Sequence, residues 1–314
     1  MQQFLFILTT VAPVFLICFL GIFLRKIRLI NDDFVHASSR LVFTVALPAL
    51  IFIKLSSTDF TRIFAFRQIA YICTSIVIMF IFIWFFSRLF LKRGQDLGAF
   101  VQGSFRGNYA IVGFALILNL FGEEALAKAS VILAFTMPLQ NLLSILVLTA
   151  TRTHGKPLDP KQTALEMLKN PLFIAILISV PFSVFQIGIP KVVENTGSYL
   201  ASLSLPLALI GIGGSLNIAS IRKASKMAFW ASVIKLLIIP ILLTAGAVRL
   251  GYRDVDLGVM FLLFAAPTAV VSFVMAGAMG ANSKLAGNIV LMTTLGASVT
   301  ITVGIYILRL LNYL

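Results

Sequence analysis

Apolar stretches of about twenty residues alternate with short polar connections along most of this chain. A helix of about twenty apolar residues is long enough to cross the hydrocarbon core of a bilayer. Because the stretches are continuous and do not alternate at every second residue, they favour membrane-spanning helices over a spanning β-barrel. The pattern predicts ten spans, at residues 4–24, 34–53, 68–90, 98–121, 129–150, 171–189, 197–217, 227–248, 257–279 and 286–308.

Composition supports a membrane protein and excludes two other classes. Hydrophobic residues make up 60% of the 314 positions and charged residues 11%, and the mean hydropathy is +1.03. A soluble domain is about 25% charged, and a disordered chain has low hydrophobicity. The sequence therefore predicts an all-α polytopic membrane protein whose partner is the lipid bilayer.

The positions of the basic residues predict the orientation of the spans. The net charge is +14, with fifteen Lys and Arg residues in the connections after odd-numbered spans or in the span ends beside them, and eight in the other connections and at the termini. Cytoplasmic loops carry the excess of positive charge, so we expect the odd-numbered connections in the cytoplasm and both termini outside it. Because the charge is explained by topology and anionic lipid, we expect no nucleic acid partner.

Prolines and glycines repeat along the chain at one offset. Pro48 and Pro206 differ by 206 − 48 = 158 positions, and Gly122 and Gly280 differ by the same number. Both prolines are candidate helix breaks. A duplication with five spans per half places the second half upside down in the membrane, as in many secondary transporters. The predicted parts are a first five-helix repeat (1–150), a cytoplasmic linker (151–165) and a second, inverted five-helix repeat (166–314).

Two predicted spans contain residues that interrupt a helix. The fourth contains Arg106, Gly107 and Asn108, and the ninth contains Pro267 followed by Thr268. Glycine tolerates non-helical backbone, and proline removes a helix hydrogen bond. Interrupted helices at matching positions of a repeat indicate a binding site, and their helix N-termini suit an anion. The alternative explanation is a proline kink and ordinary glycine packing.

The two remaining basic residues, Arg106 and Lys235, lie within predicted spans without an acidic partner there. All eleven acidic residues lie in connections or at span edges. A buried unpaired charge is costly. Either each side chain extends its charged end to the surface, or the counter-ion is an anionic substrate. Gln140 and Asn141, which follow Pro138 in the fifth span, are candidate substrate contacts or ties between helices.

The sequence predicts no cofactor, no metal site and no enzyme. Its two cysteines and two histidines do not have the spacing of a metal site, and the spans contain no catalytic set. The segment 211–214 contains three glycines, is too short for a nucleotide-binding loop, and is more typical of close helix packing. The spans lack a carboxylate that could carry a proton or sodium ion, although carbonyl, Asn and Thr oxygens could still hold sodium.

Three segments and one proline resemble the auxin efflux carrier family, specifically its short prokaryotic members. The segments are 47–52 (LPALIF), 106–113 (RGNYAIVG) and 120–124 (LFGEE), and the proline is Pro267. The resemblance covers nearly the whole chain. It implies a five-plus-five inverted repeat similar to that of bile acid symporters, in which the fourth and ninth spans cross at their breaks. It also implies a scaffold formed by spans 1, 2, 6 and 7, and a homodimer.

The same resemblance implies transport of organic anions, which are auxin in plants and dicarboxylates such as malonate in some bacterial members. The family's substrate carboxylate meets an Asn that corresponds to Asn108. The chain departs from the family pattern beside Pro267, where Thr268 and Ser272 stand in place of a second Asn.

We therefore expect a secondary transporter in the bacterial inner (plasma) membrane that exports or exchanges a small organic anion by alternating access. A sodium- or proton-coupled uptake symporter and a membrane sensor that binds the anion without moving it remain open alternatives. The candidate substrate-binding residues are Asn108, Arg106, Lys235, Thr268, Gln140 and Asn141, and the candidate helix breaks are Gly107, Pro267, Pro48 and Pro206.

Overall fold

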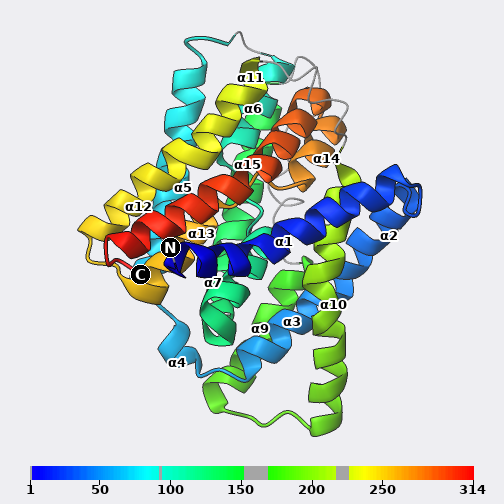
Figure 1. The fold of residues 1–314 in the computed structure, drawn as a ribbon, viewed down its shortest axis with the longest axis vertical. Coiled ribbons are helices and arrows are strands. Elements are labelled where there is room, and N and C mark those ends of the chain that lie inside the picture. The colour runs from blue at the N-terminus through cyan, green and yellow to red at the C-terminus, as the bar shows by residue number, and fades with distance from the viewer. Residues whose placement is uncertain (1, 92–93, 152–168, 217–225) are drawn as a thin grey trace.

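The described part of the computed structural model is helical (Figure 1). Apart from helices, the only regular backbone pairing among the described residues is one bridge, between Gly107 and Thr268. Most of the predicted linker, from residue 152 onward, lies outside the described residues. The structure describes residues 2–91, 94–151, 169–216 and 226–314.

Five helices pack into one group, in which α1 lies against α10, and α3 lies against both α9 and α10 (Figure 1). Glycine permits the close approach of α1 and α10, because a Cβ added at Gly213 would lie 1.9 Å from the carbonyl oxygen of Cys18. The predicted packing role of segment 211–214 is therefore confirmed. The helices of this group are α1 (Gln2–Lys26), α2 (Asp32–Leu41), α3 (Leu47–Ser56), α9 (Pro171–Phe185) and α10 (Lys191–Ser215).

The other long helices pack into a second group, in which α7 contacts α5, α6 and α13, and α15 contacts α6, α11 and α14. The short helix α4 (Phe60–Ile63) connects α3 to α5. The helices of the second group are α5 (Phe66–Ser87), α6 (Gln95–Phe105), α7 (Phe114–Ala150), α11 (Lys226–Val233), α12 (Ile239–Arg249), α13 (Asp254–Ala265), α14 (Val271–Ala278) and α15 (Ser283–Leu310).

Wide π-helical turns precede two of the prolines. The segment η1 (Val42–Ala46) leads into α3 just before Pro48, and η4 (Ile234–Ile238) leads into α12 just before Pro240. Proline has no N–H to donate to the carbonyl four residues earlier. In both places the residue before the proline donates its N–H to a carbonyl five residues back, so the helix continues through a wider turn.

Seven helical stretches among the described residues are long and apolar enough to cross a membrane. The longest covers Tyr109–Ala150, beginning with the π-helical segment η2 (Tyr109–Gly113). It contains Gly122 with φ 81° and ψ −168°, a non-helical conformation that divides it in two. Helices α6, α13 and α14 fall below spanning length because the predicted spans 98–121 and 257–279 are each interrupted. The number of ten spans stays a prediction.

Candidate functional site

The two interruptions in the second group lie against each other. Residues 106–108 separate α6 from η2, and residues 266–270 separate α13 from α14. Gly107 in the first interruption and Thr268 in the second form an antiparallel bridge. The structure therefore brings together two predicted helix breaks that are about 160 residues apart in sequence.

Hydrogen bonds between the interruptions replace those that each helix loses. The backbone N–H of Asn108 donates to the carbonyl oxygen of Pro267 at 2.7 Å, and the N–H of Ala269 donates to that of Arg106 at 3.4 Å. The Thr268 hydroxyl donates to the carbonyl oxygen of a residue in the last turn of α6, at 2.7 Å. Since buried peptide groups need partners, each interruption depends on the other.

Gly107 is required at the bridge for a steric reason. A Cβ added there would lie 2.1 Å from a ring carbon of Tyr109, closer than any ordinary contact. The Tyr109 ring is buried, and its hydroxyl contacts the side chain of Gln140 on α7. The interruption at residue 107 thus positions an aromatic ring beside one of the predicted substrate contacts.

Arg106 is buried, with 5% of its surface exposed, so its side chain does not reach the surface of the chain. One guanidinium nitrogen donates to Oδ1 of Asn141 on α7, and another donates to Sδ of Met275 on α14. The ion pairs of the described residues do not include Arg106. The predicted absence of a carboxylate partner therefore holds within the described part of the chain, and Asn141 is tied to the cation.

Lys235 is also buried, with 1% of its surface exposed. Its ammonium nitrogen donates to the carbonyl oxygen of Phe264 at 3.1 Å, in the last turn of α13. The last carbonyls of a helix lack partners within it and favour a nearby cation. Lys235 therefore completes the end of α13, and its nitrogen lies 6.0 Å from the centroid of the Tyr109 ring.

The side chain of Asn108 has no hydrogen-bond partner among the described residues, and 7% of the residue's surface is exposed. Pro48 and Pro206 do not lie at the bridge. They are in α3 and α10, and α10 is a continuous helix through Pro206.

Two cavities border α7, and neither is lined by Asn108. The larger, of about 340 Å³, lies between α7 and the helices α1, α3 and α10, and so between the two packing groups. Its walls are mostly apolar, with Asn119 and the ion pair between Lys54 and Glu123 as polar members. Its volume is in the range of small-molecule sites. Ala115, on its wall, follows Asn108 by about two helical turns.

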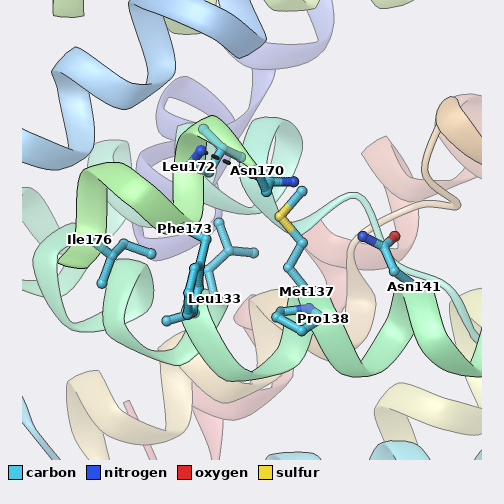
Figure 2. A pocket seen from close by; sticks show the side chains of 9 residues that line it. Leu133, Met137, Pro138, Asn141, Asn170, Leu172, Phe173 and Ile176 are labelled. Carbon is cyan, nitrogen blue, oxygen red and sulfur yellow. Dashed lines mark hydrogen bonds between the residues drawn. The ribbon is translucent and has the colours of Figure 1, made fainter. Parts of the chain in front are cut away.

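The smaller cavity lies between α7 and the first turn of α9 and has a volume of about 10 Å³, enough for about one water molecule. Figure 2 shows Met137 and Asn141 on the same side of α7, facing the turn that Asn170 caps through the N–H of Leu172. Asn141 is therefore both a wall of this cavity and a partner of Arg106.

Met275 was not among the residues singled out from the sequence, although it accepts hydrogen bonds from two polar side chains. Gln102 on α6 donates its amide to Met275 Sδ at 3.8 Å, alongside Arg106. A methionine inside an apolar stretch has the pattern of an ordinary core residue, so no sequence signal marked it.

Known proteins resemble this chain over most of its length. Residues 6–305 match a family described as membrane transport protein. The chain belongs to this family. The match confirms the resemblance to the auxin efflux carrier family, and it makes the chain a multi-pass membrane transporter with apolar spanning helices.

Three relatives named as transporters match nearly end to end. An uncharacterized transporter of Methanothermobacter thermautotrophicus is 24% identical, over 91% of this chain and 93% of the relative. The uncharacterized transporter YfdV of Escherichia coli K12 is 22% identical, over 98% and 99%. A Rhizobium meliloti protein with the name "Putative malonate transporter" is 25% identical, over 95% of each.

Proposed function

We propose that this membrane transporter exports or exchanges a small organic anion by alternating access. The observation that carries the proposal is the bridge between the two interrupted helices, because the buried residues Arg106 and Asn108 stand on either side of the bridged Gly107. Arginine stays charged in proteins, and a buried cation favours an anionic partner. The name of the R. meliloti relative adds malonate as the first substrate to test.

The proposal includes ten spans in a five-plus-five inverted repeat, with repeats at 1–150 and 166–314 and both termini outside the cytoplasm. Supporting it, Gly122 and Gly280 both have positive φ, 81° and 72°, at positions 158 residues apart. The two interruptions also pair in antiparallel fashion, as a two-fold relation would require. Labelling of single cysteines placed near each terminus, from outside intact cells, tests the orientation.

Residence in the bacterial inner membrane and assembly as a homodimer complete the proposal. Fractionation of the membranes tests the first part. Mass measurement of the purified protein in detergent tests the second, and a monomer at all concentrations would contradict it.

The deciding experiment is transport by the purified full-length protein in liposomes loaded with radiolabelled malonate. A negative interior favours exit of an anion by about 2.3 kcal/mol per charge for each 100 mV. We expect efflux that rises with an imposed negative potential, or exchange against external malonate, without any ion gradient. Transport that needs a sodium or proton gradient would instead establish coupled uptake. Binding without flux would establish a sensor and refute the proposal.

A further inference from the structure

The hydrogen-bond partners of Arg106 are poorly matched to its charge. A guanidinium carries five N–H donors and pairs best with a carboxylate. In the structure one of its donors meets an amide oxygen of Asn141 and another meets the thioether of Met275. Gln102 directs its amide N–H to the same sulfur. Two strong donors thus converge on a thioether, which is a weak acceptor.

The polar atoms around this sulfur are also incompletely paired. Oε1 of Gln102 and Oγ of Ser272 are buried and have no hydrogen-bond partner among the described residues. Ser272 precedes Met275 by one turn of α14, so both side chains lie on one face of that helix. Buried polar groups in native proteins are nearly always paired. Of these two atoms only the Ser272 hydroxyl can donate a hydrogen bond. The cluster therefore has one unused donor for a ligand, besides the N–H groups of Arg106 and Gln102 that are now directed at the sulfur.

We propose that a carboxylate of the transported anion binds at the position of Met275 Sδ, between Arg106 and Gln102, and that the Met275 side chain moves aside when it binds. This inference rests on the proposed anion transport and assigns the residues of its site. A carboxylate oxygen there accepts from both donors, and it neutralises the buried cation. Methionine is unbranched and flexible, so its displacement has a low energetic cost.

Asn141 lies between this site and the small cavity that separates α7 from α9. Its side chain holds Arg106 on one side and forms a wall of the cavity between α7 and α9 on the other (Figure 2). Because this cavity holds about one water molecule, it has to widen before an anion can enter it and reach the guanidinium past Asn141. Met275 is the present acceptor of Arg106 and, as a thioether, a weak one.

The test measures the affinity of the purified full-length protein for malonate and propionate by titration calorimetry, with sodium chloride at equal ionic strength and propylamine as controls. Met275→Leu keeps the volume but removes the internal acceptor, so it should bind carboxylates about three- to tenfold more tightly. Gln102→Leu should weaken binding by about the same factor. The matched control is Met260→Leu, at a fully buried methionine of α13, which should leave affinity unchanged.

The outcomes separate this inference from the proposed function. If malonate is transported but Met275→Leu and Gln102→Leu both bind within about twofold of the unmodified protein, the site is elsewhere and the transport proposal stands. If Met260→Leu changes affinity as much as Met275→Leu, the effect comes from a general change in core packing and the site is refuted. If no carboxylate binds or moves, both proposals fail. Melting temperatures without ligand establish that each variant is folded, and Gln102→Met replaces Gln102→Leu if the latter is not.

Discussion

The contact between α1 and α10 makes a sharp prediction about two glycines that lie two positions apart. A methyl group at Gly213 would lie 1.9 Å from the carbonyl oxygen of Cys18, whereas the atoms nearest to a methyl at Gly211 are serine hydroxyls 3.6 and 3.7 Å away. Gly211→Ala therefore adds only an ordinary contact and gains up to about 1 kcal/mol in helix propensity. Gly213→Ala forces apart two backbones, which cannot turn aside as a flexible side chain can.

Forcing an extra carbon into a packed core costs about 1–3 kcal/mol, and the upper end applies because the clash is with backbone. We expect Gly213→Ala to be less stable than Gly211→Ala by about 2–3 kcal/mol. In a thermal unfolding assay of the purified protein this corresponds to a melting temperature lower by on the order of 5 °C. Gly21→Ala should resemble Gly213→Ala, since its methyl would lie 2.3 Å from the carbonyl oxygen of Ile210. Equal melting temperatures for the variants at 211 and 213 would show that α1 and α10 are farther apart than described.

Three further predictions concern an ion pair between two helices, the carboxylate that caps α4, and one of the interruptions. The ion pair of Lys54 and Glu123 joins α3 to α7, and its carboxylate is exposed. A double-mutant cycle on thermal stability should therefore give a coupling energy between the two side chains below about 1 kcal/mol, which disappears in high salt. The hydroxyl and N–H of Thr61 hold the pKa of Asp59 below its usual value. The ionised carboxylate therefore stabilises the fold at neutral pH, and this contribution is lost as the pH falls through the lowered pKa. The melting temperature of Asp59→Asn should accordingly fall less between pH 7 and pH 3 than that of the unmodified protein. Asn108→Ala should reduce malonate transport by about tenfold or more, the value of a hydrogen bond to a charged group, with an unchanged melting temperature, and full transport would remove Asn108 from the site.

Periodicity located the helices because burial in lipid requires continuous apolar stretches. The predicted spans 4–24 and 286–308 correspond closely to α1 and α15. Sequence reasoning also placed the two interruptions, because glycine and proline act on the local backbone. It did not predict π-helical turns, whose widening appears only in the hydrogen bonds, although Pro48 and Pro240 were visible signals for them.

The resemblance implied that the fourth and ninth spans cross at their breaks, but the residues that pair there, Gly107 and Thr268, lay beyond local sequence rules. Local rules say that a freed carbonyl needs a partner, but they do not say which one. The sequence marked Asn141 as a substrate contact or a helix tie, and the structure shows its bond to Arg106. The role of Met275 depended entirely on which side chains surround it.

The two buried cations, Arg106 and Lys235, differ in the hydrogen-bond acceptors that surround them. Lys235 donates to a carbonyl at the end of α13, where the helix presents partial negative charge, so its charge is balanced in part by the fold. Among the described residues, the acceptors of Arg106 are a neutral amide oxygen and a thioether. An arriving anion therefore gains more from Arg106 than from Lys235, because the lysine would have to give up a bond that α13 needs. We therefore propose that Arg106 recognises the anion directly, and that Lys235 acts chiefly by keeping the interrupted helix in place beside Tyr109.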